Sequence, residues 1–275
     1  ALKWLMVYPR FWVQRAAAHR GFREYGSRYP HPLLFVAGMP KSGTTWLERM
    51  LSAYPGYQDL LIPAATFAEL RGEAGHLFEL PAHAFARLRR CLVLTKMHCP
   101  GSSGNASVLR EAGAPHVILY RDPRDVAVSY VHYVKDTPWH EDFPALRDLS
   151  LADALQFFLR RRLPEFAHWM RSWQEHRDPD NSLMLSYEEL LADPTAALTR
   201  ILHLFGLEAG EDLVRDLVER NRFEASRSSG EGGGFFRKGV AGDWRNHFDE
   251  TLKHTFREVD ADLLVEFGYE AGSEW

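Results

Sequence analysis

The chain has 275 residues, of which 45% are hydrophobic and 25% are charged. This composition is typical of a globular protein, and the length is sufficient for a large buried core. The net charge of -4 argues against a general nucleic-acid binder, because a phosphate backbone requires a strongly basic protein face. Two cysteines, Cys91 and Cys99, are too few for a disulfide framework and form no CxxC pair, so we expect a cytoplasmic protein without zinc.

No linker-like composition and no internal repeat divides the chain, so we expect one domain across residues 1–275. The stretch from Leu2 to Phe22 has no apolar run near the roughly 18 residues of a membrane-spanning helix and no clean signal-peptide core. Its apolar residues are interrupted by Lys3, Arg10, Arg15 and Arg20. We interpret residues 1–30 as a helical extension packed on its own domain, with binding to a membrane or partner as the alternative.

Short apolar runs predict the strands of a sheet. Three of them are Leu33 to Gly38, Cys91 to Thr95 and His116 to Tyr120, and each is followed by a turn and a helix-like segment. A further strand is predicted at Ser182 to Ser186. Strands that alternate with helices predict an α/β fold with a central, mainly parallel sheet flanked by helices. Ligands of such folds gather beyond the carboxyl ends of the strands.

Helices dominate the second half of the predicted fold. Ser150 and Asp153 form an acidic version of the capping box, and the apolar spacing after them predicts one long helix toward Gln174. Further helices are predicted over Pro194 to Phe205, Glu211 to Arg220 and Glu250 to Phe267. Residues 226–234 contain four glycines, which predicts a mobile loop that we extend over residues 226–244.

A glycine-containing turn joins the first predicted strand to a helix, with the sequence Gly38-Met39-Pro40-Lys41-Ser42-Gly43-Thr44-Thr45-Trp46. Such a turn presents backbone N–H groups and the positive end of a helix to an anion, so we predict a P-loop-like phosphate-binding loop. The pattern nearly fits GxxxxGK(S/T), but Thr44 stands where that motif has its lysine. Lys41 lies three residues earlier and could reach a group that is bonded to the phosphate. The hydroxyl groups of Ser42, Thr44 and Thr45 would donate hydrogen bonds to the phosphate itself.

The segment from Pro40 to Trp46 resembles the 5′-phosphosulfate loop of the cytosolic sulfotransferase family. The resemblance implies transfer of a sulfuryl group from 3′-phosphoadenosine-5′-phosphosulfate (PAPS) to a small-molecule hydroxyl or amine, with 3′,5′-ADP (PAP) as the product. It also implies that this loop, including Gly43, binds PAPS, that Lys41 bonds the bridging region of PAPS and that Trp46 stacks on the adenine.

Further segments extend the resemblance in chain order. Thr95 to Pro100 resembles the family's Lys-x-His-x-Pro strand end, which implies that Lys96 lies near the transferred group and that His98 is catalytic. Tyr120 to Tyr130 resembles the segment that binds the 3′-phosphate, which implies that role for Arg121 and Ser129. We count Ser129 among the catalytic candidates as well.

Three parts of the resemblance lie nearer the C-terminus. Phe235 to Trp244 resembles the family's RKGxxGDW box, which adds Arg237, Lys238 and Gly239 to the PAPS-binding candidates. Weaker similarities add Tyr187 and Phe223. The family's dimer signature, KxxxTVxxxE, is not recognisable around residues 251–266, so the sequence leaves the oligomeric state open.

The chemistry of these residues supports the same function. Sulfuryl transfer spreads negative charge over the SO₃ group and the leaving oxygen, which Lys41 and Lys96 can neutralise. Histidine titrates near neutral pH, so His98 is the predicted general base. A monoanionic sulfuryl group needs less neutralisation than a γ-phosphoryl group, and we therefore expect no metal.

Two other functions compete with this prediction: an ATP-dependent P-loop small-molecule kinase and a non-catalytic nucleotide-binding module. Thr44 in place of the motif lysine disfavours the kinase, and the presence of both Lys41 and His98 disfavours the module. The motifs do not specify the acceptor. Four aromatic residues could line an apolar acceptor pocket or could pack within the core, namely Tyr130, Tyr133, Trp139 and Phe143.

Overall fold

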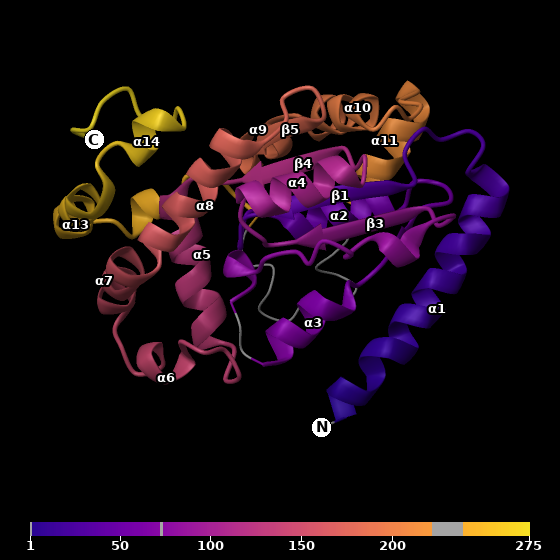
Figure 1. Cartoon of the computed structure of the whole chain (residues 1–275). Helices are drawn as coiled ribbons and strands as arrows, with labels where there is room; N and C mark the ends of the chain where they lie inside the picture. The colour runs from indigo at the N-terminus through magenta and orange to yellow at the C-terminus, as the bar shows by residue number, and fades with distance from the viewer. Residues whose placement is uncertain (1, 72–73, 222–238) are drawn as a thin grey trace.

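The computed structural model describes residues 2–71, 74–221 and 239–275. Within these residues, five parallel strands form one sheet in the order β2-β3-β1-β4-β5 (Figure 1). The strands are β1 (Leu33–Gly38), β2 (Gln58–Asp59), β3 (Val93–Met97), β4 (His116–Tyr120) and β5 (Ser182–Ser186). The predicted α/β fold with a parallel central sheet is confirmed.

Helices surround this sheet in Figure 1 and connect its strands. The α-helices before β5 are α1 (Leu2–Tyr25), α2 (Thr44–Ser52), α3 (Pro63–Leu70), α4 (Ser103–Glu111), α5 (Pro123–Lys135), α6 (Phe143–Leu146), α7 (Leu151–Arg161) and α8 (Leu163–His176). Those after β5 are α9 (Tyr187–Ala192), α10 (Pro194–Leu204), α11 (Glu211–Arg220), α13 (Glu250–Asp260) and α14 (Leu263–Glu266). Short 3₁₀ helices are η1 (Gly75–Leu77), η2 (Ala86–Leu88) and η3 (Asp243–Asn246).

The sheet separates two hydrophobic cores, as the side chains of β1 show. Leu34 and Val36 point into a core formed with α2, α10 and α11, whereas Phe35 and Ala37 point into a second core formed with α5, α7, α8 and α13. All residues of β1 are buried, because helices cover both faces of a parallel sheet. This burial explains why the predicted strands are continuous apolar runs.

The predicted strand from Cys91 to Thr95 begins two residues too early. The N–H of Leu92 donates to the carbonyl of Ala18 in α1 at 3.0 Å, so the chain pairs with a helix before it joins the sheet. Pairing with β1 starts only at Val93, and Lys96 consequently lies inside β3. Strand β2 was not predicted, because two polar residues carry no apolar pattern.

The long helix predicted from Ser150 to Gln174 is wrong, because the structure has two helices, α7 and α8, separated by Arg162. Pro164 has no N–H to donate, and its ring clashes with a preceding helical carbonyl, which explains the break. The helix start is confirmed, since the hydroxyl of Ser150 accepts the N–H of Asp153 at 3.1 Å.

The helix predicted from Glu250 to Phe267 is also divided, into α13 and α14. Asp260 ends α13, and its carboxylate accepts two N–H groups of Arg171 in α8 at 2.6 and 2.9 Å. The turn that follows allows the adjacent residues Leu263 and Leu264 both to be buried. The helix predicted at Pro194 is confirmed, with the N-cap Asp193 accepting the N–H of Ala196 at 2.9 Å.

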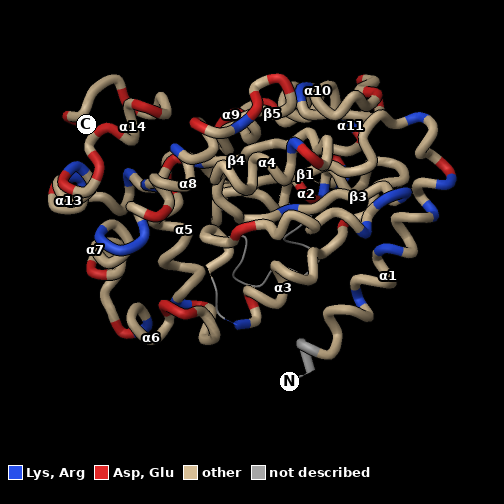
Figure 2. Tube along the Cα trace, in the orientation of Figure 1, with Lys and Arg blue, Asp and Glu red and all other residues tan. Residues whose placement is uncertain are grey.

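The N-terminal helix α1 lies along the edge of the fold, beside β2 and α3 (Figure 1). Its residues Val7, Phe11 and Ala18 are buried, and Tyr8 contacts Phe67 of α3 with ring centroids 5.6 Å apart. Figure 2 shows basic residues along its length. Among the described residues, no helix has the length and apolar character needed to cross a bilayer.

Candidate active site

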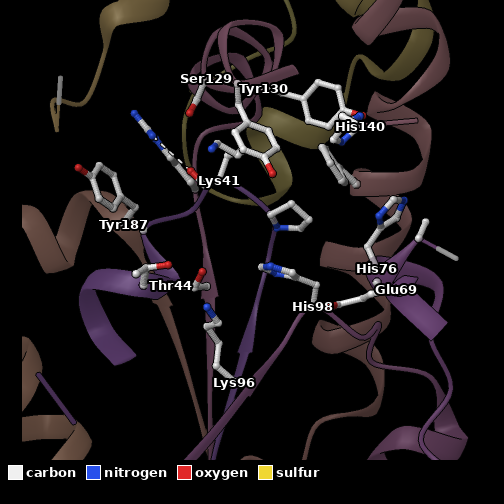
Figure 3. A pocket seen from close by; sticks show the side chains of 18 of the residues that line it. Lys41, Thr44, Glu69, His76, Lys96, His98, Ser129, Tyr130, His140 and Tyr187 are labelled. Atoms are coloured by element: carbon white, nitrogen blue, oxygen red, sulfur yellow. Dashed lines mark hydrogen bonds between the residues drawn. The ribbon is translucent and has the colours of Figure 1, made fainter. Parts of the chain in front are cut away.

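A cavity of about 580 Å³ opens at the carboxyl ends of β1, β3 and β4 (Figure 3). Eleven of the predicted site residues line it: Lys41, Gly43, Thr44, Thr45, Trp46, Lys96, His98, Arg121, Ser129, Tyr187 and Gly239. They come from the loop after β1 and the start of α2, the ends of β3 and β4, the middle of α5, the start of α9 and the segment before η3. The structure therefore brings segments that are far apart in the sequence to one cavity.

Four predicted residues are not among those lining the cavity. The hydroxyl of Ser42 is fully buried and donates toward the carbonyls of Met39 and Leu119, at 2.7 and 3.0 Å. This geometry turns the Ser42 side chain away from the cavity, so it braces the loop against β4 instead of reaching a phosphate as we expected. The other three, Phe223, Arg237 and Lys238, lie outside the described residues.

The loop between β1 and α2 has a backbone that only particular residues allow. A Cβ atom on Gly38 would lie 1.7 Å from Cγ2 of Thr44, and one on Gly43 would lie 2.7 Å from the ring of Tyr187. Gly43 has a φ of 84°, and Lys41 has a φ of 69°, which is unusual for a residue other than glycine. Such backbone strain is concentrated at functional sites, where the surrounding structure holds it in place.

Lys41 is enclosed at this loop. Its Nζ lies 4.0 Å from the ring centroid of Tyr133 in α5. Burial, followed by the nearby positive charge of Arg121, lowers the pKa of Lys41 to about 7. A bound anion would reverse that shift, because opposite charge favours the protonated amine. The site is therefore electrostatically suited to an anionic ligand.

Arg121 lies at the end of β4 and holds several parts of the cavity together. Its guanidinium donates to the carbonyl of Lys41 at 3.3 Å and to that of Val240 at 2.8 Å. The same group stacks over Tyr187, with 4.4 Å between Cζ and the ring centroid. Its buried Nε has no hydrogen-bond partner within the described part of the chain, and neither has Nε1 of Trp46. Both residues line the cavity, and buried donors without a partner are rare in folded proteins.

Asp125, in the first turn of α5, ties the C-terminal segment to this site. Its carboxylate accepts the backbone N–H groups of Gly242 and Trp244 at 2.6 and 2.9 Å and lies 3.5 Å from the guanidinium of Arg121. Asp125 was not among the predicted site residues. The only available signal was its place in the segment from Tyr120 to Tyr130, which does not reveal a contact with a loop more than 100 residues later.

His98 follows directly after β3. Its Nδ1 lies 2.5 Å from the carbonyl oxygen of Gly38. Because a carbonyl only accepts, Nδ1 carries the proton and Nε2 of the neutral ring retains its lone pair. Burial, followed by the charge of Lys96, lowers the pKa of His98 to about 4. The ring is therefore neutral near pH 7, as a proton acceptor must be.

Lys96 is held differently from Lys41. Its Nζ forms an ion pair with the carboxylate of Glu48 in α2 at 2.9 Å, and both side chains are about four-fifths buried. Asp59 of β2 lies near this pair, and burial together with the charge of Glu48 raises the pKa of Asp59. Sequence reasoning missed both carboxylates, because neither belongs to a recognised motif.

The rest of the cavity lies between α3, α5 and α8. Of the four aromatic residues for which lining and core packing were both left open, Tyr130, Tyr133 and Trp139 line the cavity, whereas Phe143 is not among the lining residues and packs against the core. Sequence reasoning missed several further lining residues, namely Glu69, His76, His140, Glu141 and Phe166. Within the described residues, no three histidine, cysteine, aspartate or glutamate side chains gather as metal ligands do.

Comparisons with known proteins agree with this geometry. The family model described as "Sulfotransferase domain" matches residues 31–268. Human sulfotransferase 2B1 is 28% identical over 244 residues, which cover 81% of this chain and 63% of that protein. Guinea-pig (Cavia porcellus) sulfotransferase 1E1 is 24% identical over 249 residues, which cover 81% of this chain and 80% of the relative. The chain thus spans less than two thirds of the first of these relatives.

Solved structures show the same fold. Mouse sulfotransferase SULT7A1, crystallised with PAP, has a TM-score of 0.66 and 20% identity, covering 90% of this chain and 89% of its own. Retinol dehydratase, crystallised with androsterone and the inactive cofactor PAP, has a TM-score of 0.59 and 22% identity. The match covers 89% of this chain and 85% of the retinol dehydratase chain. At these identities the likeness concerns the fold alone.

Proposed function

This chain belongs to the sulfotransferase family, and from that premise we propose that it transfers a sulfuryl group from PAPS to a small-molecule hydroxyl or amine. One observation carries the proposal most directly. The enclosed cations Lys41 and Arg121 and the unprotonated Nε2 of His98 meet in a single cavity at the carboxyl ends of the strands. Cations for an anionic donor and a base for the acceptor are the two requirements of this reaction.

The cofactor half of the cavity suits a nucleotide that carries anionic groups on both the 3′ and the 5′ position of its ribose. PAPS carries about four negative charges, so separated cationic sites are needed. Gly43, Thr44 and Thr45 begin α2 and present its positive end to the cavity, beside Lys41. Arg121 follows the end of the neighbouring strand β4 and Ser129 lies within α5, and both line the cavity, where the guanidinium and the hydroxyl are suitable donors to phosphate oxygens.

The reaction assigns a separate task to each residue. The acceptor oxygen bonds to sulfur while the bond between sulfur and the 5′-phosphate oxygen breaks, and Nε2 of His98 takes the acceptor proton. Lys41 neutralises the charge that develops on the leaving oxygen, which becomes part of 3′,5′-ADP. Binding of the anionic donor raises the pKa of His98 from its low value in the free protein and so makes it a stronger base.

The acceptor half supports a small hydroxyl-bearing molecule. Tyr130, Tyr133 and Phe166 provide aromatic walls. Androsterone is bound in one structure of retinol dehydratase and retinol in another, and both were crystallised with PAP. We propose the same general arrangement here, with the acceptor placed against these walls and its hydroxyl toward His98. The buried, unpaired Cys91 and Cys99 support our proposal of a reducing, cytoplasmic location.

Titration calorimetry with three nucleotides tests this function. We expect 3′,5′-ADP to bind at least about tenfold more tightly than 5′-AMP, because a 3′-phosphate adds charge-assisted hydrogen bonds. We also expect it to bind more tightly than ATP with magnesium, and we expect EDTA to leave sulfuryl transfer from PAPS intact. Equal affinity for 3′,5′-ADP and 5′-AMP would remove the case for PAPS.

A further inference from the structure

Glu69 places a carboxylate beside the reacting centre. It lies in the last turn of α3, lines the cavity, and points toward His98 in Figure 3. Oε1 of Glu69 and Cδ2 of His98 both lie within 4 Å of the position that a Cβ atom on Gly75 would take, at 3.8 and 3.9 Å. The missing side chain of Gly75 thus leaves open space between the carboxylate and the imidazole.

This carboxylate is not satisfied by the protein. Among the residues that the structure describes, Glu69 has no hydrogen-bond or ion-pair partner. Glu69 is an exposed residue of the cavity wall, and its partial burial there raises its pKa. The positive charge of Lys96 is the one influence that lowers that pKa. An ionised carboxylate in such surroundings is stabilised by a cation that enters the cavity.

Lys96 cannot serve as that cation without giving up another partner. Its Nζ is bonded to Glu48 at 2.9 Å, and Asp59 lies beside the pair. The positive charge of Arg10 in α1 lowers the pKa of Asp59 but is not among the causes that shift the pKa of Glu69. One ammonium therefore acts on three carboxylates in this corner, and Glu69 is the one for which the described residues provide no bond.

The donor nucleotide cannot fill the role either, because it is anionic and like charges repel. The remaining ligand of the cavity is the acceptor. We propose that Glu69 binds a cationic amino group of the acceptor, which makes the preferred substrate an alcohol or phenol that also carries an amine. The aromatic rings of Tyr130 and Phe166 in the same cavity favour a cation further. This inference rests on the proposed sulfuryl transfer and specifies its substrate class.

A matched pair of phenols tests the proposal. The compound 4-(2-aminoethyl)phenol is a cation near pH 7, whereas 4-propylphenol has nearly the same shape and no charge. For the wild-type protein with PAPS, we expect kcat/KM to be at least about tenfold higher for the amine, in line with one charge-assisted hydrogen bond. Glu69→Gln keeps the size of the side chain and should reduce this preference to about threefold or less.

Glu141→Gln is the matched control, because Glu141 lines the same cavity but is already paired with Arg162 at 2.7 Å. We expect the control to retain the preference for the amine. A wild-type preference for 4-propylphenol, an unchanged ratio in Glu69→Gln, or an equal loss in the control would each overturn the proposal. So would failure to sulfonate the amine while 3′,5′-ADP still binds. Loss of 3′,5′-ADP binding by the wild type would instead refute the proposed function itself.

Discussion

The two ends of the cavity differ in charge and in how the chain builds them. At the cofactor end, Lys41 and Arg121 are cations at the ends of neighbouring strands, and short contiguous segments supply most of the lining. At the acceptor end, Glu69 and Phe166 come from helices nearly 100 residues apart. Backbone geometry therefore defines the first end, whereas tertiary packing assembles the second.

His98 lies where the two ends meet, and its replacement should have the largest effect. In His98→Asn the amide can still donate to the carbonyl of Gly38, but the side chain offers no base. We expect kcat to fall by about 10² to 10⁴, the usual contribution of a positioned base, with little change in the affinity for 3′,5′-ADP. Turnover and calorimetry on the same preparation check this. Near-normal turnover in a variant that binds nucleotide would exclude His98 as the base.

Lys41 tests whether the cofactor end stabilises the transition state or only the bound nucleotide. We expect Lys41→Met to lower kcat by about 10² to 10³, comparable with the loss of one preorganised donor to developing negative charge. The affinity for 3′,5′-ADP should fall much less, because the contact strengthens as the bond breaks. Single-turnover rates compared with dissociation constants provide the measurement. A loss confined to nucleotide affinity would assign Lys41 to ground-state binding.

Arg121 probes the same end through the nucleotide. Arg121→Lys keeps the charge but removes the planar fork of donors. We expect the affinity for 3′,5′-ADP to fall by about 1.5 to 3 kcal/mol, as for a lost charge-assisted hydrogen bond, with a smaller loss for 5′-AMP. Equal losses for the two nucleotides in calorimetry would show that Arg121 does not bind the 3′-phosphate.

The pH dependence of binding sharpens the contrast in charge. The pKa of Lys41 is about 7 in the free protein, so its positive charge is present below pH 7 and is lost as the pH rises. We expect the affinity for 3′,5′-ADP to fall by up to about tenfold between pH 7 and 8, where one proton must be taken up on binding. Lys41→Arg remains charged throughout this range and should lose that dependence. An unchanged dependence in the variant would contradict the assignment to Lys41.

The pairing of Lys96 with Glu48 should give the smallest effect, because Glu48 acts on the reaction only through the position of Lys96. If Glu48 holds Lys96 in its working position, the double variant Glu48→Gln/Lys96→Met should be no slower than Lys96→Met alone. From the kcat values of this double-mutant cycle, we expect a coupling free energy of about 1 kcal/mol between the two substitutions. Additive losses would show that the two residues act independently.

The sequence predicted the cofactor end well because its chemistry depends on local order. A strand, a turn that needs Gly38 and Gly43, and a helix start together form a phosphate loop wherever they occur in this order. The acceptor end was not predictable in the same way. Glu69 belongs to no motif, and only the packing of α3 against η1 brings it near His98.

The errors in the fold have the same origin. The helical spacing of apolar residues continues from α7 into α8, so periodicity alone hides the break at Arg162. Pro164 was the local signal for it, but proline is also common in the first turn of a helix and here marks the start of α8. β2 is too short to have a pattern, and its existence depends on its pairing with β3.

Transfer of ³⁵S from labelled PAPS to a phenol, measured in a single turnover with EDTA present for 4-(2-aminoethyl)phenol and 4-propylphenol in parallel, is the most direct test of sulfuryl transfer by this chain. We expect label to appear in at least one of the phenols with release of one 3′,5′-ADP per transfer, and we expect His98→Asn to slow both together. Label that remained in PAPS or appeared only as free sulfate with both phenols, with the protein folded and the nucleotide bound, would contradict sulfuryl transfer.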